Sequence, residues 1–393
     1  MWSVIRKAQG LSPNVSAYAA QPLAERRARH QRVIVTHETR PFTPWIDPKI
    51  YTRAYGDLDY DKVARWLLEE EPGMRLQAIK HLIELYTEDR VHGVRSLDYG
   101  MLPLLIQMVG GDPVEELRSL AASALAMLLR EPATQRSADH ETWRTYLSGL
   151  IAATKDGCDG VVVLSLRALA ACHAHFNHFF LTELLVMELS GVELMIELIC
   201  SSPNATVRAV ACNELTKMFD VAETFARFSR LEGVVILTDT LRAAADDDAM
   251  LLAAAAEVLS RGCESAPCRH AAVRYETMSA LFPHLSHGDL LVRVAVTAAL
   301  AQITILEAAK IQASDWPPLL EAVLYAIGQE VERDVLVFLA RLVYHISECP
   351  KGRAALRPCR DHLEQLYAFT SDGDEGDITR LTLANTISIL YRK

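Results

Sequence analysis

Apolar and small residues recur along most of this chain at helical spacing, and one pattern returns at a near-constant interval. An arginine is followed three residues later by a small or apolar residue, and four residues after that by another apolar residue. This spacing places all three side chains on one face of a helix. Four copies keep the arginine: Arg75–Ala78–Leu82, Arg118–Ala121–Leu125, Arg208–Ala211–Leu215 and Arg293–Val296–Leu300. Degenerate copies are Leu252–Ala255–Leu259, Arg333–Leu336–Ala340 and a weaker one near Arg167.

The interval between the copies indicates the fold class. Positions 75, 118, 208, 252, 293 and 333 are separated by 43, 90, 44, 41 and 40 residues, and the interval of 90 leaves room for one further unit around 163–167. Self-similarity at about 40–47 residues is typical of armadillo and HEAT helical arrays. We therefore expect an all-α, right-handed, armadillo/HEAT-like solenoid of about seven to eight repeats, preceded by an extended N-terminal arm.

The order of elements within a unit favours the armadillo type. A glycine precedes a short apolar helix, a polar turn follows, and the arginine-bearing helix comes last. The glycine is predicted to supply a backbone bend between a first and a second helix. The alanine of the third helix is predicted to let neighbouring helices approach closely. The glycines and the helices that follow them are Gly100 before Met101–Val109, Gly191 before Val192–Cys200 and Gly233 before Val234–Leu241.

Breakers and caps predict where the array begins and ends. A helix over Lys62–Glu70 is predicted to be capped by Asp61 and separated by Pro72-Gly73 from a second helix over Met74–Tyr86. Near the C-terminus, Ser371–Asp377 reads as an acidic loop, and a final helix over about Ile378–Tyr391 is expected to cap the stack.

Residues 1–50 differ in charge from the rest of the chain. They hold eight basic and three acidic residues, out of 40 basic and 50 acidic residues in all. Residues 51–393 therefore hold 32 basic and 47 acidic residues, so a segment of net charge about +5 precedes one of about −15. We divide the chain into a basic, mostly non-helical docking arm at 1–50 and an armadillo-like repeat domain at 51–393. A basic arm is attracted to an acidic partner or to the body itself.

The arm carries most of the residues predicted to contact a partner. Three prolines within 41–48 fix the backbone there as extended. Two other interpretations stay open: a plain disordered tail, or a mitochondrial targeting peptide, since residues 1–24 contain basic and small residues and no acid. The predicted contact residues are Arg26, Arg27, Arg29 and Arg32 for charge, with Phe42 and Trp45 as apolar anchors.

The recurring arginines are interpreted as architectural. An arginine near the start of a helix that faces the preceding unit can donate several hydrogen bonds to carbonyl or carboxylate oxygens of that neighbour. Such a residue stitches one layer to the next, and its recurrence in successive layers favours this role over a ligand site. The four residues are Arg75, Arg118, Arg208 and Arg293.

Side chains able to bind a metal are sparse. Zinc requires about four convergent ligands, and in the densest group only two histidines, three residues apart, share a helix face. A second group has no further ligand nearby, so we expect no metal site. The first group is Cys172, His173, His175 and His178, and the second is Cys263, Cys268 and His270.

Catalytic motifs are also missing from the sequence. There is no phosphate loop, no dinucleotide-binding glycine fingerprint and no nucleophile elbow. Repeat-fold metal hydroxylases carry symmetry-related His-Glu dipeptides on their helices, whereas here only His37-Glu38 and His140-Glu141 occur, the first of them in the arm. We expect no enzyme, no cofactor and no small-molecule substrate.

Other functional classes are disfavoured by composition. The net charge of −10 argues against a general nucleic-acid binder, and no uninterrupted apolar run reaches the length of a membrane span. None of the five tryptophans has an asparagine four residues later, unlike the Trp–Asn ladder of nuclear import adaptors. The eight cysteines lie mostly within apolar helical pattern, which predicts reduced thiols in the cytoplasm.

The segment Ile50–His92 resembles a known family. Thr52-Arg53-Ala54-Tyr55-Gly56 leads into a helix, the first arginine motif follows, and the repeat ends in the acidic turn Thr87-Glu88-Asp89. This order is similar to the start of the radial spoke head 14 homologues, which are armadillo-type proteins of motile cilia and flagella. The resemblance covers about 40 residues, and the longer basic arm departs from the family pattern.

The resemblance implies a structural subunit of the axonemal radial spoke, with other spoke proteins as partners and with Tyr51 and Tyr55 as further contact residues. We therefore expect a non-catalytic scaffold in the cytoskeleton of the cilium or flagellum. The alternatives are a soluble cytoplasmic adaptor that binds peptides in its concave groove and, more remotely, a repeat-fold metal enzyme. A mitochondrial location is the alternative to the axoneme.

Overall fold

The computed structural model describes residues 60–135, 137–172, 179–369 and 374–391, and every regular element in these ranges is a helix. The helices form eight successive units, which agrees with the expected number. The first unit has two described helices, and each later unit has a short first helix, a second helix and a third helix. The expected all-α armadillo-like solenoid is confirmed.

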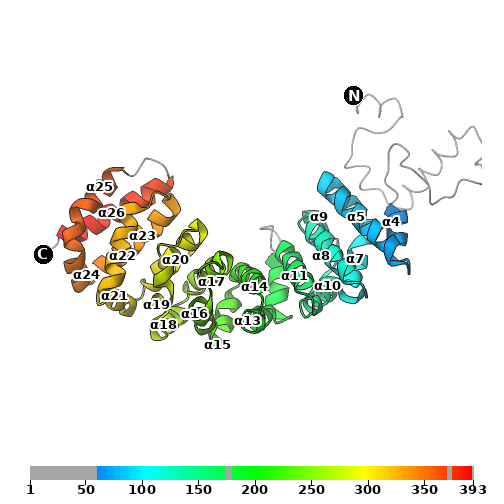
Figure 1. Cartoon of the computed structure of the whole chain (residues 1–393), viewed down its shortest axis with the longest axis horizontal. Helices are drawn as coiled ribbons and strands as arrows, with labels where there is room; N and C mark the ends of the chain where they lie inside the picture. The colour runs from blue at the N-terminus through cyan, green and yellow to red at the C-terminus, as the bar shows by residue number, and fades with distance from the viewer. Residues whose placement is uncertain (1–59, 136, 173–178, 370–373, 392–393) are drawn as a thin grey trace, which may run out of the picture.

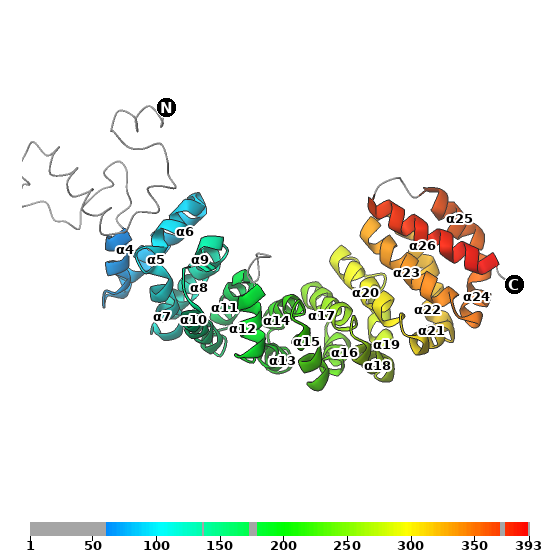
Figure 2. The ribbon, with the colours of Figure 1, turned by 180° about the vertical axis from the view of Figure 1, so that it is seen from behind.

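The third helices line the concave side of a curved array, as Figures 1 and 2 show from its two faces. We call them the inner helices. Each inner helix packs against the inner helix of the next unit, so they form one continuous layer from end to end. They are α5 (Pro72–Glu88), α8 (Glu115–Leu129), α11 (Asp159–Cys172), α14 (Ala205–Met218), α17 (Ala249–Gly262), α20 (Leu290–Ile303), α23 (Arg333–Ser347) and α26 (Asp374–Tyr391).

In the middle of the array the first and second helices lie on the convex side of this layer (Figure 1). The second helices are α4 (Tyr60–Leu67), α7 (Met101–Gly111), α10 (His140–Ala153), α13 (Gly191–Ser201), α16 (Gly233–Ala243), α19 (Thr277–Leu281) with η2 (Phe282–His284), α22 (Pro317–Gln329) and α25 (Arg360–Phe369). The first helices are α6 (Arg90–Leu97), α9 (Pro132–Gln135), α12 (Phe179–Met187), α15 (Ala222–Arg230), α18 (Ala266–Arg274), α21 (Glu307–Ser314) and α24 (Pro350–Leu356) with η3 (Arg357–Cys359).

The core runs the whole length of the array. The small and apolar residues of the four arginine motifs are all buried, with Ala78, Leu82, Ala121 and Leu125 at 0% exposure in the first two copies. Burying each large apolar side chain contributes roughly 1.5–3 kcal/mol. Since a single unit is too thin to bury these residues alone, neighbouring units stabilise each other.

The bend before the second helix is built differently from the prediction. Gly100 does adopt the left-handed conformation, with φ of 73°. In the units of Gly191 and Gly233, however, the bend falls on the preceding residues, Ser190 and Glu232, with φ of 54° and 55°. Gly233 is required for a different reason: a Cβ atom there would lie 2.1 Å from Cε2 of Phe228. This glycine serves close packing of the first helix on the second.

Two helix boundaries also differ from the prediction. Asp61 lies inside the first turn of α4, which starts at Tyr60 and ends at Leu67. At the other end, α26 starts at Asp374, inside the segment predicted as an acidic loop. Acidic residues in a first turn are favoured by the helix dipole, so an acidic segment can begin a helix instead of interrupting one.

Candidate protein-binding groove

Three of the four predicted arginines join neighbouring units through the turn that precedes the inner helix. In the first unit, Nη1 of Arg75 donates to the carbonyl oxygens of Glu69 and Glu70 at 2.8 and 2.9 Å. Its Nε lies 3.0 Å from a carboxylate oxygen of Asp112, in the turn of the second unit. Arg75 therefore fixes its own turn and the next one at the same time.

The second unit repeats this geometry and extends the chain of contacts. Nη1 of Arg118 donates to the carbonyl oxygen of Asp112 at 3.0 Å, and its Nε lies 2.8 Å from the carboxylate of Asp156 in the third unit. Asp112 thus binds Arg75 through its side chain and Arg118 through its main chain. Burial alone would raise the pKa of Asp156, but hydrogen bonds from Arg118 and the Cys158 amide lower it overall.

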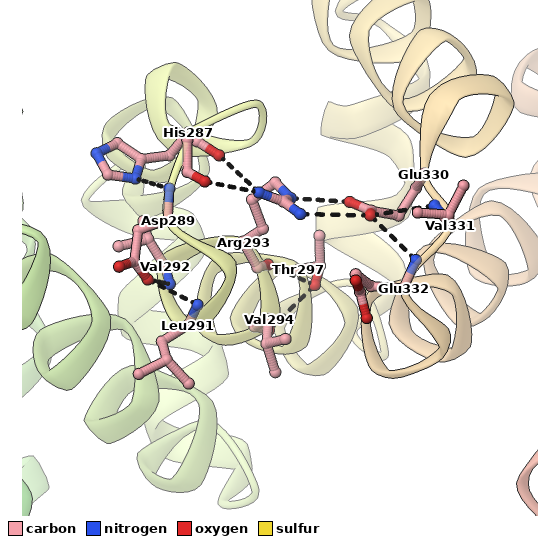
Figure 3. A network of polar contacts seen from close by, with 11 residues as sticks. His287, Asp289, Leu291, Val292, Arg293, Val294, Thr297, Glu330, Val331 and Glu332 are labelled. Atoms are coloured by element: carbon pink, nitrogen blue, oxygen red, sulfur yellow. Dashed lines mark hydrogen bonds and ion pairs between the residues drawn. The ribbon is translucent and has the colours of Figure 1, made fainter.

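The same contact recurs between the sixth and seventh units, as Figure 3 shows. Nη1 of Arg293 donates to the carbonyl oxygens of His287 and Gly288 at 3.0 and 3.1 Å, and its Nε donates to Glu330 at 2.8 Å. Burial would raise the pKa of Glu330, but the hydrogen bond from Arg293, the amide of Glu332 and the Arg293 charge lower it. The carboxylate is therefore ionised and paired.

The architectural interpretation of these arginines fits the contacts, but the predicted direction was wrong. Each guanidinium binds the turn of its own unit and an acid of the following unit, not of the preceding one. The reason is that a long side chain on a helix points toward the N-terminal end of that helix. At the N-terminal ends of the inner helices, the turn of one unit lies next to the turn of the following unit.

Arg208 does not complete the series. No ion pair or side-chain hydrogen bond joins Arg208 to another described residue. The acid at the equivalent position, Asp246, has an 89% exposed side chain and lies 3.7 Å from Nδ1 of His284 instead. We call the contacts made by Arg75, Arg118 and Arg293 the arginine ladder. This ladder does not join the fourth unit to the fifth.

Two of the degenerate copies were placed in the wrong register. Arg167 is exposed on α11, and Val162, which is 44 residues after Arg118, occupies the position of the ladder arginine. Arg333 is exposed as well, and Leu336, 43 residues after Arg293, takes that position in α23. An apolar residue replaces the arginine in these units, so a search for arginine alone chose a neighbouring one.

A cavity of about 380 Å³ lies across three consecutive inner helices at the C-terminal end of the concave face. We call it the concave groove. Its wall on α23 carries residues three and four positions apart, which place them on one helix face. The lining residues are Ala301 and Gln302 of α20, Ile305 just after that helix, Phe338, Arg341, Tyr344 and His345 of α23, and Thr382 and Asn385 of α26.

The groove combines apolar surface with polar groups that are open to a ligand. The guanidinium of Arg341 lies over the ring of Phe338, 5.7 Å from its centroid, and forms no ion pair with a described residue. Gln302 and Asn385 flank it from the neighbouring units, and neither side chain forms a hydrogen bond with another described residue. These side chains can therefore exchange water for the main-chain and side-chain groups of a bound segment.

His345 forms the neutral floor of the groove. Burial lowers its pKa to about 4, and the charge of Lys310 acts in the same direction while Glu348 opposes it. Its Nδ1 lies 3.1 Å from the Thr304 hydroxyl, which itself donates to the Leu300 carbonyl at 2.9 Å. With a pKa near 4 the ring is uncharged near neutral pH, and the contact with the Thr304 hydroxyl orients it.

A second, larger cavity of about 640 Å³ lies between α21 and α24, on the convex side. Three of its four charged lining residues are already paired, since Lys310 binds Glu348 and Lys351 lies 2.7 Å from Asp315, which leaves Glu307 without an ion pair to a described residue. Groups that are paired within the protein offer less to a ligand than the open ones of the concave groove. We therefore take the concave groove as the candidate site.

The described residues were compared with the requirements of a metal site and of a membrane-spanning helix. Within these ranges no three metal-capable side chains come together. Cys263 and Cys268 are buried, and burial raises the pKa of both thiols, while His270 is exposed. No described helix is long and apolar enough by itself to cross a membrane. Helices α20 and α21 reach that length and composition only together, and they meet at 115°.

The predicted contact residues of the arm lie outside the described residues, and so do the two tyrosines of the opening segment and the histidines at 173, 175 and 178. The domain boundary at residue 50 also stays a prediction. The concave groove itself was missed by the sequence analysis. A signal for it was present, because Phe338, Arg341 and His345 follow helical spacing on the face of α23 opposite its apolar stripe.

Comparisons with known proteins agree with this architecture. No family model and no curated protein sequence matches the chain. Among solved structures, an engineered protein matches with a TM-score of 0.61 and 17% identity over 85% of this chain and 89% of its own. A structure solved for work on a phosphorylation switch in the interaction between cadherin and β-catenin matches with a TM-score of 0.62 and 15% identity, over 83% of this chain and 60% of its own.

A designed armadillo repeat protein in complex with the peptide (KR)4 matches with a TM-score of 0.53 and 15% identity, over 63% of this chain and all of its own. The chain has an armadillo fold. At these identities the similarity extends to the fold alone.

Proposed function

We propose that this chain is a non-catalytic scaffold that binds a segment of another protein on its concave face. The observation that carries the proposal is the concave groove, where open polar groups of three units converge on one continuous layer of helices. Because each inner helix is fixed by its neighbours, the groove is preorganised, and preorganisation reduces the entropic cost of binding. A similar solved structure supports a protein ligand, because it is a designed armadillo repeat protein in complex with a peptide.

We further propose that the assembly is the axoneme of a motile cilium or flagellum, with the chain as a radial spoke subunit. The support is the resemblance of residues 50–92 to the radial spoke head 14 homologues. The arm would then dock on an acidic neighbour through Arg26, Arg27, Arg29 and Arg32, with Phe42, Trp45, Tyr51 and Tyr55 as anchors.

A tagged copy expressed in a ciliated cell tests this proposal. The tag is expected along the axoneme and in the fraction that resists detergent extraction. A copy that lacks residues 1–50 is expected to incorporate poorly if the arm docks the protein. Normal incorporation of this truncated chain would contradict the docking role, and a fully extractable, diffuse protein would contradict the axonemal role.

A soluble adaptor is the second candidate function, and the open polar groups of the groove favour it. An adaptor would bind an isolated peptide tightly and leave the cell with the detergent-soluble fraction. A mitochondrial signal from the same tag would instead support the targeting interpretation of the arm. Elemental analysis of the purified protein tests the remaining enzyme alternative, because a stoichiometric metal would contradict a non-catalytic scaffold.

A further inference from the structure

We propose that the concave groove selects an extended segment with an acidic side chain, and that Arg341 is the residue that recognises this carboxylate. The inference rests on the proposed function, since it names the chemistry of the segment that the groove binds.

The state of Arg341 differs from that of the ladder arginines. Arg293, on the preceding inner helix, is held by two carbonyl oxygens and by the carboxylate of Glu330. Among the described residues, Arg341 has no ion-pair partner and lies over the Phe338 ring. A guanidinium that stacks on an aromatic ring keeps its donors in one plane, ready to bind a carboxylate with two parallel hydrogen bonds.

Among the residues that the structure describes, no lining residue of the groove compensates the charge of Arg341. None of these lining residues is acidic, and His345 is neutral because its pKa lies near 4. The acid that acts on the pKa of His345 is Glu348, and it is bound by Lys310. A positive groove on a chain of net charge −10 is therefore a local exception, and it complements a negative ligand.

The positions of the amide side chains define where the acidic residue binds. Gln302 lies on the unit before Arg341 and Asn385 on the unit after it. Packed helices are separated by about 8–10 Å, so an extended segment of about six residues, at roughly 3.3 Å per residue, would span all three units. The two amides can bind its main chain at both ends, and Arg341 then meets a side chain near its middle.

The test uses the full chain and three capped eight-residue peptides that carry a fluorophore. Alanine alternates with Glu in the first, Gln in the second and Lys in the third. Fluorescence anisotropy is expected to show the Glu peptide binding at least about tenfold more tightly than the Gln peptide, a gain typical of one charge-assisted contact. Arg341→Gln is expected to remove this preference, and Arg341→Lys to restore part of it.

A matched control is Arg167→Gln, which removes one positive charge from an exposed position on α11 of the same concave layer. It is expected to leave the preference unchanged, and thermal unfolding of all variants verifies that they fold. If Arg167→Gln and Arg341→Gln have equal effects, the preference reflects general charge attraction and the inference is wrong.

Other results would overturn the inference in distinguishable ways. Equal binding of the three peptides, unaffected by Arg341→Gln, would remove the acidic specificity and leave the scaffold function intact. Tighter binding of the Lys peptide would assign the groove a basic partner. A single-stranded oligonucleotide that displaces the Glu peptide at equal charge concentration would make the groove an anion site and not a peptide site. Failure of every peptide to bind up to about 1 mM would count against both the inference and the proposed function.

Discussion

Arg75 and Asp112 form an ion pair across the boundary between the first two units, with Nε 3.0 Å from the carboxylate and only 11% and 5% of the two side chains exposed. Because water is largely excluded, removal of one partner leaves a buried charge. We expect Asp112→Ala to lower the free energy of unfolding by about 3 kcal/mol, measured by urea denaturation.

The same boundary supplies the control for that prediction. Lys80 and Glu116 also join α5 to α8, at 3.1 Å, but more than half of each side chain is exposed. Glu116→Ala is expected to cost less than about 1 kcal/mol. If the two substitutions had equal effects, the buried pair would have no special role in joining the units.

Arg208 offers a second test of the ladder. Since it forms no ion pair with a described residue, Arg208→Met should keep the packing of the side-chain stem and change the free energy of unfolding by less than about 1 kcal/mol. Arg118→Met removes the contacts to Asp112 and Asp156 and is expected to cost about 3 kcal/mol. A large loss on Arg208→Met would mean that the fourth and fifth units are joined through this arginine after all.

Gly233 is predicted to be intolerant of even one extra methyl group. A Cβ atom there would approach Cε2 of Phe228 to 2.1 Å, so Gly233→Ala should destabilise the protein by at least about 2 kcal/mol. Gly111→Ala, at the end of α7 with open space around it, should be neutral or slightly stabilising. In a Phe228→Ala background, Gly233→Ala should cost much less. A full cost in that background would place the conflict in the backbone and not at the ring.

Glu214 on α14 predicts a pH dependence of stability. Burial raises its pKa from 4.5 to about 7, although Lys217, 2.9 Å away, opposes this. Between these two values the unfolded chain loses the proton while the folded chain keeps it, so this carboxyl destabilises the fold progressively as the pH rises. Once the pH exceeds about 7, the destabilisation is complete.

Glu214→Gln should therefore raise the melting temperature at pH 8 and have little effect at pH 5, where the carboxyl is already neutral in the folded protein. The measurement is thermal unfolding of both proteins at the two pH values. Stabilisation that is equal at pH 5 and pH 8 would assign the effect to packing and not to ionisation.

The repeat architecture could be predicted because similar residues recur at the same buried positions of successive units. The alanines and leucines of the arginine motifs are buried as expected, and the interval between them gave the number of units. The register failed where the chain departs from the pattern, since Val162 and Leu336 stand in place of an arginine. The bend at Glu232 was missed because a non-glycine residue in the left-handed conformation has no clear sequence signal.

The spacing of Phe338, Arg341 and His345 on α23 gives one wall of the concave groove, but a rule confined to one unit could not give the other two walls. Gln302, Arg341 and Asn385 are about 40 residues apart in sequence and converge only because successive inner helices lie side by side. The open state of Arg341 is equally a tertiary property. Arg293 is paired with Glu330 of the next unit, whereas Arg341 lies over Phe338 and has no ion-pair partner among the described residues.

The central claim is that the concave face, and not the convex one, holds a partner protein. A photoreactive benzoylphenylalanine in place of Tyr344 of the groove tests it in a ciliated cell, with the same replacement at Tyr325 as the control. Tyr325 is 67% exposed on α22, outside the inner layer, so both sites accept an aromatic side chain. Irradiation is expected to give one discrete adduct from position 344, identified by mass spectrometry as an axonemal protein, and none from position 325. Adducts from position 325 alone, or the same adducts from both positions, would contradict the claim.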